Sequence, residues 1–160
     1  MNQIEHLIDT CKDNTEVAHM QAKGLSHADS LLLPPFRANC MNWVLGHILT
    51  SRDECLALLD GQPVLSAAET EVYARGSLPL ADSAQALALE DLLARLVEAQ
   101  NRLIEKLSAL DAAALQAEVK FGRSPRPLEE VLTFLQWHET YHIGQLELLR
   151  QLTGVNDQVI

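Results

Sequence analysis

Two histidines near the end of the chain, His138 and His142, have the spacing of neighbouring turns on one face of a helix. Side chains at positions i and i+4 project in the same direction, so their ring nitrogens can converge on one ion. Buried imidazoles are costly without partners, so the pair predicts a metal site inside a helical bundle. Core histidines that bond to other groups are the alternative. The pair belongs to a series typical of the inward face of a bundled helix: Val131, Leu135, His138, His142, Gln145, Leu149 and Leu152.

A third ligand for such an ion should come from another helix, because sites in bundles are built from inward side chains on facing helices. His47 is the best candidate. It lies in an apolar setting of Trp43, Val44 and Leu45, next to Gly46, which leaves room for a close helix or a ligand. Three neutral imidazoles suit Zn²⁺, Ni²⁺ or Fe²⁺ and leave a coordination position for water or substrate. The alternative for His47 is a core histidine whose nitrogens bond to ordinary partners.

Three further polar residues, Gln100, Gln145 and Arg52, lie on the inward faces of these helices. Either glutamine can bond to a metal-bound water or hold an imidazole in one tautomer. The alternative is that the two bond to each other or to backbone across the bundle. Arg52 is predicted to extend to solvent or to pair with a carboxylate, and the alternative is that it attracts an anionic cosubstrate. The remaining histidines lie off the inward faces or in a loop and are predicted to be solvated: His6, His19 and His27.

The sequence from His138 to His142 also matches His-Glu-x-x-His, the helix of zinc metalloproteases in which the glutamate is the general base. The context argues against a peptidase. Gln145 and Leu148 occupy the positions where the extended motif has a glycine and a third histidine, and no sheet is predicted that would align a peptide substrate. Glu139 falls one residue away from the inward face, so we expect it to be exposed or to lie just behind the ligands.

The hydrophobic periodicity and the abundance of Ala and Leu predict an all-α protein. Residues 62–82 are expected to form a crossover or a lid, and residues 121–126 a turn. We therefore predict a four-helix bundle with two long connections, in a single domain that spans residues 1–160. The first expected helix runs from Ile4 to Lys23, and the second from an N-cap at Asn39 to its end at Gly61. The third follows a cap at Ser83 and reaches about Leu110. Leu128 opens the fourth, where Pro127 suits the first helical position, and Gly154 closes it.

The charge and composition argue against several classes of partner. A formal net charge of -10, with lysines and arginines scattered singly, disfavours nucleic acid and an anionic membrane surface. No apolar run approaches the ~20 residues that cross a bilayer, and the first residues are not typical of a signal peptide. The cysteines are far apart and odd in number, which predicts buried free thiols of a cytoplasmic protein: Cys11, Cys40 and Cys55.

Two segments of the chain together resemble the DinB/YfiT-like family. They are Asn42-Trp43-Val44-Leu45-Gly46-His47-Ile48 and Trp137-His138-Glu139-Thr140-Tyr141-His142-Ile143-Gly144-Gln145-Leu146. The resemblance covers nearly the whole chain and implies a four-helix bundle that holds a divalent ion through His47, His138 and His142. It also implies frequent homodimers. Some relatives are S-transferases that use low-molecular-weight thiols such as bacillithiol or mycothiol, and others are thiol-dependent isomerases.

The residues and the resemblance leave three functions open, the first two of them on a small-molecule substrate. In the first, the ion binds a thiol as thiolate and presents it to an electrophile, as in a metal-dependent thiol S-transferase. In the second, the ion activates water as a metal-dependent hydrolase. In the third, the bundle binds a metal or ligand without turnover. Trp43 and Trp137 are expected in the core, or alternatively along the cleft.

Overall fold

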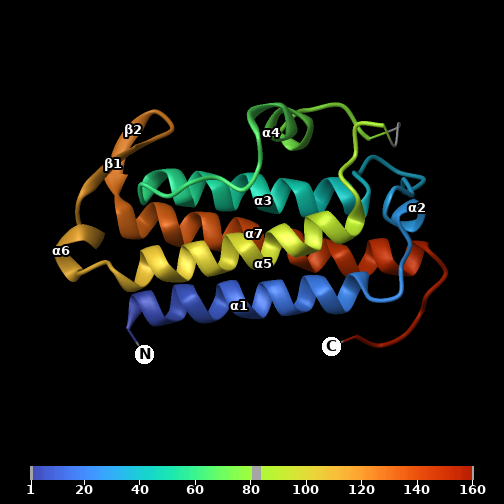
Figure 1. Ribbon diagram of the computed structural model, residues 1–160, viewed down its shortest axis with the longest axis horizontal. Coiled ribbons are helices and arrows are strands. Elements are labelled where there is room, and N and C mark those ends of the chain that lie inside the picture. The colour runs from blue at the N-terminus through green and yellow to red at the C-terminus, as the bar shows by residue number, and fades with distance from the viewer. Residues whose placement is uncertain (1, 81–83, 160) are drawn as a thin grey trace.

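Four long helices form the body of the molecule, and short elements join them (Figure 1). The computed structural model describes residues 2–80 and 84–159. The predicted all-α fold is confirmed, and no helix in the described residues has the length and apolar character needed to cross a membrane. The long helices are α1 (Gln3–Ala22), α3 (Met41–Leu58), α5 (Leu89–Ser108) and α7 (Leu128–Leu152). The short elements are α2 (His27–Ser30), α4 (Ala67–Tyr73), α6 (Ala112–Leu115), β1 (Glu118–Phe121) and β2 (Ser124–Pro127).

Local polar groups and glycines set several of the helix ends. At the start of α1, the Asn2 side chain accepts from the Glu5 amide at 2.9 Å, and the Glu5 carboxylate accepts from the Asn2 amide at 2.8 Å. These bonds satisfy amides that have no partner within the helix. Gly24 and Gly154 follow α1 and α7 with φ of +78° and +87°, a conformation that glycine adopts without steric cost. Both glycines end the helices that the sequence predicts them to end.

One predicted helix start needs correction, and another is confirmed. The N-cap of α3 is Cys40 and not Asn39, and its side chain makes no capping bond. Cys40 and Met41 are both buried, so apolar packing rather than a polar cap fixes this end. The predicted start of the fourth helix is confirmed: α7 begins at Leu128, and Pro127 is both its N-cap and the last residue of β2. The cap predicted at Ser83 lies outside the described residues.

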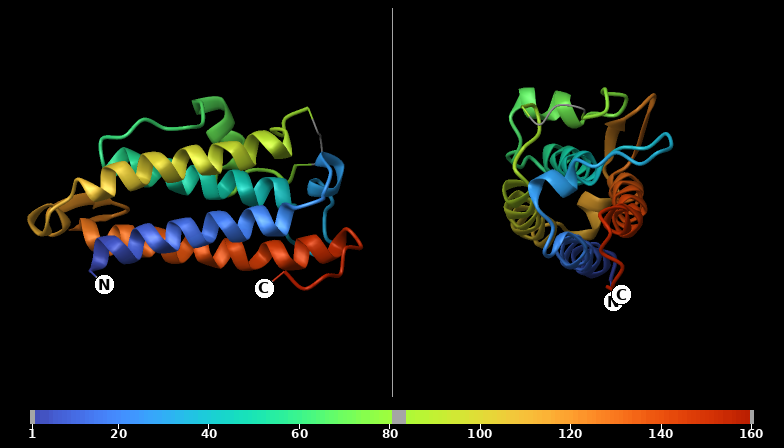
Figure 2. Two further views of the ribbon diagram at one scale, coloured as in Figure 1. Left: turned by 60° about the horizontal axis from the view of Figure 1, so that its bottom comes forward. Right: turned by 90° about the vertical axis from the view of Figure 1, so that its right-hand side faces the viewer.

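Each long helix packs against two others, in the cyclic order α1–α5–α3–α7 (Figure 2). α1 and α7 run in one direction, and α3 and α5 run in the opposite one (Figure 1). The apolar core has two parts, one around Leu45, Leu92 and Leu146 and one around Leu7 and Leu56. α3 is buried along most of its length because α5, α7 and the connection that carries α4 cover different sides of it.

The long connection between α3 and α5 is a crossover, as predicted, and it packs on α3 (Figure 1). Tyr73 ends the short helix α4 within it. The Tyr73 hydroxyl donates to Asn42 Oδ1 at 3.0 Å and accepts from the Leu87 amide at 2.8 Å. A Cβ atom at Gly46 would lie 2.2 Å from the Tyr73 ring, so the absence of a side chain there is what lets the ring reach α3. The crossover is thereby held against the turn of α3 that carries His47.

Residues 121–126, predicted as a turn, belong to a β-hairpin. β1 and β2 pair in antiparallel fashion. The second strand contains Pro125 and Pro127, which cannot donate to a ladder, so the sequence carries little strand signal here. The hairpin leads into α7, and Phe121 packs on Phe134 with ring centroids 5.8 Å apart.

The buried face of α7 is displaced by about one residue from the predicted one. His138, His142 and Gln145 are half-buried and lie at the edge of this face, where α7 meets α3. The reason is that the positions beside them turn towards the centre of the bundle. The buried residues are Leu128, Val131, Leu132, Leu135, Glu139, Ile143, Leu146, Leu149 and Arg150.

Candidate metal centre

His47, His138 and His142 come together at the contact of α3 with α7. One ligand nitrogen from each residue lies within 4.8 Å of the other two. The ring centroids of His138 and His142 are 4.5 Å apart, and that of His47 is 5.2 and 4.9 Å from them. His47 is buried, and the other two are half-buried. The fold therefore assembles the three histidines selected from the sequence; that they bind an ion stays a prediction.

Two of the rings bond through Nδ1 to a carbonyl oxygen. His47 Nδ1 is 2.8 Å from the backbone oxygen of Tyr73, and His142 Nδ1 is 2.8 Å from Gln145 Oε1. A carbonyl oxygen only accepts hydrogen bonds, so both Nδ1 atoms carry the hydrogen and both Nε2 atoms carry a free lone pair. Metal-ligating histidines have this arrangement, because their second nitrogen donates to an oxygen that fixes the tautomer and the ring orientation.

His138 has the same arrangement through the hydroxyl group of Ser51. The Ser51 hydroxyl donates to the backbone oxygen of His47 at 3.3 Å, and its oxygen is 3.2 Å from His138 Nδ1. When the hydroxyl hydrogen is directed at that backbone oxygen, the hydroxyl oxygen accepts from His138 Nδ1–H. With this placement each of the three rings carries a lone pair on Nε2, and the Nε2 atoms of His138 and His142 face each other.

The distance between the ligand nitrogens fits a shared ion. His138 Nε2 and His142 Nε2 are 3.1 Å apart. In the tautomers set by the Nδ1 bonds both atoms are acceptors, so their lone pairs repel each other. Two nitrogens bound to one tetrahedral ion at about 2.0–2.1 Å lie about 3.3 Å apart. The residues present thus fit a divalent cation such as Zn²⁺, Ni²⁺ or Fe²⁺, which would turn this repulsion into two attractive bonds.

Burial keeps the three imidazoles neutral. It lowers the pKa of His138 to about 4, with further lowering from the charges of His142, His47 and Arg75. Burial also lowers the pKa of His142, and it lowers the pKa of His47 by more than the bond to the Tyr73 carbonyl raises it. Neutral imidazole is the form that binds metal, so at neutral pH no proton has to leave before an ion enters.

A cleft of about 720 Å³ adjoins the three histidines. This size suits a small organic molecule. Trp43 forms part of its wall and stacks on His47, with ring centroids 4.7 Å apart and an interplanar angle of 16°. The other walls are the loop before α3, Arg75 after α4 and the outer side of α7: Pro34, Pro35, Phe36, Arg37, Ala38, Asn39, Val44, Tyr141, Gln145, Leu148, Leu149, Gln151 and Leu152.

The two tryptophans have different environments. Trp43 is 6% exposed, belongs to the core as predicted and also lines the cleft. The core prediction for Trp137 is wrong, because this side chain is 61% exposed. It lies on the outer side of α7, away from the buried face. Phe134, Tyr141 and Leu148 are exposed on the same helix, so a largely apolar stripe runs beside the cleft.

Glu139 is buried in an ion pair with Arg52, so of its two expected states the exposed one is wrong. Arg52 Nε and Nη2 donate to the two carboxylate oxygens at 3.0 and 2.7 Å. The guanidinium also donates to the Leu96 backbone oxygen at 2.7 Å and to Thr15 Oγ1 at 2.9 Å. Burial is the largest single influence and lowers the pKa of Arg52, but Glu139, Cys11 and Cys55 together raise it by more. The predicted pairing of Arg52 with a carboxylate is confirmed, and the pair joins all four long helices.

Gln100 and the three cysteines lie outside the histidine site. Gln100 is half-buried on α5, and within the described residues no hydrogen bond joins it to Gln145, which instead holds His142. The prediction of free thiols is confirmed; Cys11 and Cys40 are buried and Cys55 is half-buried. Burial raises the pKa of Cys11 to about 11, so this thiol stays protonated at neutral pH and is a poor nucleophile.

Sequence reasoning missed two residues that orient the rings, Ser51 and Tyr73. Ser51 follows His47 by four residues, so both lie on one face of α3, and this spacing was a usable signal. Tyr73 contributes its backbone oxygen from another element. No side-chain pattern reports such a contribution, so only the fold reveals it.

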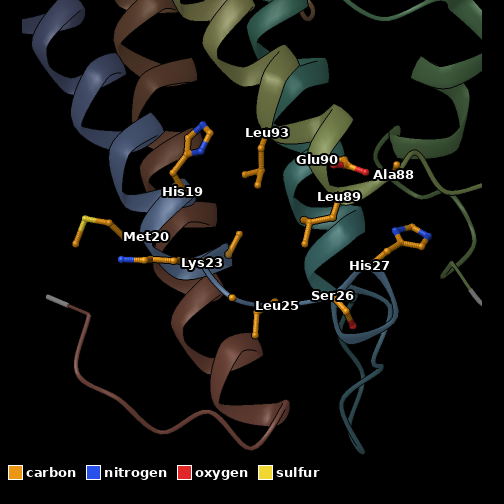
Figure 3. A pocket seen from close by; sticks show the side chains of 12 residues that line it. His19, Met20, Lys23, Leu25, Ser26, His27, Ala88, Leu89, Glu90 and Leu93 are labelled. Atoms are coloured by element: carbon orange, nitrogen blue, oxygen red, sulfur yellow. The ribbon is translucent and has the colours of Figure 1, made fainter.

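A second cavity, of about 700 Å³, lies where α1 ends, between α2 and the start of α5 (Figure 3). His19 and His27 line it and are half-buried, less exposed than the solvated side chains that the sequence predicts. His19 Nε2 and His27 Nδ1 are buried atoms without a hydrogen-bond partner in the described part of the chain. Leu89 and Leu93 lie between the two rings in this view. His6 is exposed, as predicted.

Comparison with known proteins agrees with this fold. The chain is similar to a conserved protein from Enterococcus faecalis of known crystal structure, with a TM-score of 0.75 and 17% sequence identity over 96% of this chain and 98% of that one. A likeness at this identity concerns the fold alone. No curated protein matches the sequence. Residues 22–146 match the DinB superfamily, which is most of the chain. The helices, the three-histidine group and this match lead to one conclusion: the chain belongs to the DinB superfamily.

Proposed function

We propose that this protein binds one divalent metal ion through the Nε2 atoms of His47, His138 and His142 and uses it on a small molecule in the adjoining cleft. One observation carries the proposal. Each Nδ1 atom lies against a protein oxygen, which leaves the Nε2 atoms for a ligand in a group whose ligand nitrogens lie within 4.8 Å of one another. Three protein ligands leave a position for substrate. Zn²⁺, Ni²⁺ and Fe²⁺ all suit this donor set, and their availability decides among them.

The reaction that we propose is the transfer of a low-molecular-weight thiol to an electrophile. The bound ion would supply a lower thiol pKa, so that the thiol reacts as thiolate after releasing its proton to solvent. Trp43 lies flat on His47 and, with Tyr141 and Leu148, gives the cleft an apolar wall. This wall orients the second substrate and keeps water from the sulfur while the new carbon–sulfur bond forms and the leaving group departs with its electron pair.

The position of Glu139 favours thiol transfer over hydrolysis. The His-Glu-x-x-His metalloproteases place a glutamate base beside the water that they activate. Both carboxylate oxygens of Glu139 are bonded to Arg52, and no carboxylate of residues 2–80 and 84–159 lines the cleft. A thiol needs no such base once its pKa is lowered. A metal-dependent hydrolase and a binding module without turnover are the alternatives to be tested.

Metal binding is tested first, by elemental analysis of protein purified without a histidine tag. We expect about one Zn, Ni or Fe atom per chain in the wild type and only background metal in the His138→Ala, His142→Ala variant. A His6→Ala, His19→Ala variant removes the same number of imidazoles from outside the site and should retain the metal. Equal metal content in the wild type and in the His138→Ala, His142→Ala variant would refute the proposal.

The reaction is tested with cobalt-substituted protein. Bacillithiol and mycothiol should each be added, and binding of sulfur to cobalt should produce a new charge-transfer band. A metal-loaded protein whose spectrum neither thiol perturbs would rule out thiol transfer. Turnover of an ester or amide without any thiol would instead support the hydrolase. Metal and ligand binding without turnover of any of these substrates would support the binding module.

We further propose that the chain forms homodimers through the exposed stripe on α7. Phe134 and Trp137 are exposed at helical spacing in the part of this stripe that does not line the cleft, and an exposed apolar patch on a soluble protein is typical of an interface. A second copy of this chain is the partner that the resemblance to the DinB/YfiT-like family implies. Light scattering should give twice the chain mass for the wild type, and a Trp137→Asp variant should shift it towards the monomer mass. A monomeric wild type would contradict this proposal.

A further inference from the structure

We propose that the cleft beside the three histidines binds a small organic anion, whose charged group is held by Arg37 and Arg75 and whose apolar part lies against Trp43, Tyr141 and Leu148. The inference rests on the proposed function in that it names the substrate class of the same site. It is carried by the charges of the cleft wall, which do not depend on whether an ion is bound.

The cleft has the opposite charge to the rest of the molecule. The chain has 22 Asp and Glu residues against 12 Lys and Arg, for a formal net charge of -10. Among the described residues that line the cleft, Arg37 and Arg75 are the charged side chains at neutral pH, and no aspartate or glutamate is present. A concave site with positive walls in an acidic protein concentrates anions.

Arg37 and Arg75 are also available to a ligand. Other arginines pair with carboxylates: Arg52 with Glu139, Arg95 with Glu69, Arg102 with Glu98 and Arg150 with Asp157. Within the described ranges, neither Arg37 nor Arg75 makes an ion pair or a side-chain hydrogen bond, and both are exposed. A guanidinium offers a planar fork of donors that matches a carboxylate or a phosphate.

The backbone on both sides of Arg75 is fixed to the site. Two residues before it, the Tyr73 backbone oxygen bonds to His47 at 2.8 Å. Two residues after it, Ser77 Oγ accepts from the Trp43 indole at 2.8 Å. These bonds hold the segment between them against α3, so that Arg75 lies at the cleft. Its charge also reaches the histidines, since it lowers the pKa of His47 and His138.

The rest of the cleft wall determines which uncharged part of the ligand lies beside its charged group. Trp43, Tyr141 and Leu148 present aromatic and aliphatic surface to the cleft, and its volume of about 720 Å³ suits a small molecule rather than a polymer. The ligand chemistry is therefore an anionic group joined to a short apolar body. A carboxylate and a phosphate share this chemistry, so the experiment includes both.

The test compares three probes that share one alkyl chain: hexanoate, hexyl phosphate and the uncharged hexanamide. Binding is followed by the indole N–H resonance of Trp43 in metal-free protein, so that no probe can be held by an ion. We expect one of the anions to bind at least about tenfold more tightly than hexanamide, the gain of one charge-assisted contact. The anion with the higher affinity identifies the preferred group.

Variants assign the selectivity to the arginines. In an Arg37→Gln, Arg75→Gln variant the preferred anion should lose at least about tenfold in affinity, while hexanamide binding and metal content stay as in the wild type. The Arg75→Lys variant keeps the positive charge but not the planar fork of donors, so its loss of anion affinity should be smaller than that of the double variant. The control is Lys12→Gln, which removes one positive charge from an exposed site on α1 and should leave binding unchanged.

Two results would overturn the inference: wild-type protein that binds neither anion more tightly than hexanamide, or a double variant that binds the anion as the wild type does. Either could occur in a protein that loads metal normally, which would leave the proposed metal site intact. Anion selectivity in a protein that contains no metal under any loading condition would instead refute the proposed function and support this inference.

Discussion

Two polar clusters lie next to each other between α3 and α7, and they differ in how their polar atoms are satisfied. Arg52 and Glu139 bond to each other, and the guanidinium also reaches α1 and α5. In the histidine cluster only the Nδ1 atoms have oxygen partners, and Nε2 atoms face one another. The two clusters are one residue apart in sequence, since Glu139 follows His138 and Arg52 follows Ser51.

The difference separates a structural cluster from a functional one. Buried polar groups in folded proteins are nearly always satisfied, and a satisfied network fixes how the elements pack. The Arg52–Glu139 pair meets this condition with protein atoms alone. The Nε2 atoms of His138 and His142 lie between the same pair of helices but, among the described residues, have only each other as partners and border the cleft, where a ligand can reach them.

The largest expected effect is a loss of stability when the Arg52–Glu139 pair is broken. Glu139→Leu leaves the Arg52 charge buried without its partner, and we expect the free energy of unfolding to fall by about 3–5 kcal/mol. Urea unfolding of metal-free protein measures it. The Arg52→Met, Glu139→Leu double variant should be less destabilised than Glu139→Leu, because it leaves no unpaired charge. A Glu139→Leu protein as stable as the wild type would contradict the structural assignment.

Metal should stabilise the molecule only through the histidine cluster. With free Zn²⁺ at about 100 times its dissociation constant, the native state should gain about 2.7 kcal/mol. This gain appears as a higher unfolding temperature. It should vanish in the His138→Ala, His142→Ala variant and persist in the Arg52→Met, Glu139→Leu double variant. A gain of the same size in the histidine variant would place the metal elsewhere.

A smaller effect is expected from the residue that orients His142. Gln145→Leu removes the acceptor of His142 Nδ1, so metal affinity should fall by about 10–100-fold, as measured by competition with a chelator. The stability of the metal-free protein should change little, since Gln145 is only half-buried. Gln151→Leu is the matched control, because Gln151 lines the cleft without bonding to a ligand. Equal losses of metal affinity in the two variants would argue against a role of Gln145 in orienting His142.

The smallest expected effect is on how the stability of the metal-free protein depends on pH. Burial lowers the pKa of His138 to about 4 from the ordinary 6.5, so between these values the unfolded chain binds a proton that the folded protein does not. Stability of the metal-free protein should therefore decrease as the pH falls through this window. His138→Gln should show a shallower decrease than the wild type in urea unfolding across this range. Parallel pH profiles for the two proteins would contradict the lowered pKa.

Most of the fold could be predicted because hydrophobic spacing and end signals agree over long segments. Gly24 and Gly154 end their helices where expected. The β-hairpin could not be predicted, because Pro125 and Pro127 carry no strand signal and its pairing depends on the strand opposite. The start of α3 was misplaced because the burial of Cys40, a tertiary effect, outweighs the capping preference of Asn39.

The histidine trio could be predicted because i and i+4 spacing fixes which side chains share a face. The environment of Glu139 could not, since a displacement of one residue moves a position from the edge of a helix face to its centre. Arg52 is its partner only because α3 packs beside α7. The role of Tyr73 depends on a backbone atom in a distant crossover, and sequence patterns do not report such contacts.

The ligand histidines and the walls of the cleft come from different kinds of structure. The histidines lie on packed helices, whereas much of the wall comes from residues 34–39 and from Arg75, outside the long helices. Loops accept substitutions and insertions that a packed helix does not. We therefore expect related chains to diverge in cleft shape and charge while keeping the same metal-binding frame. In such a lineage substrate range evolves quickly, and the underlying chemistry evolves slowly.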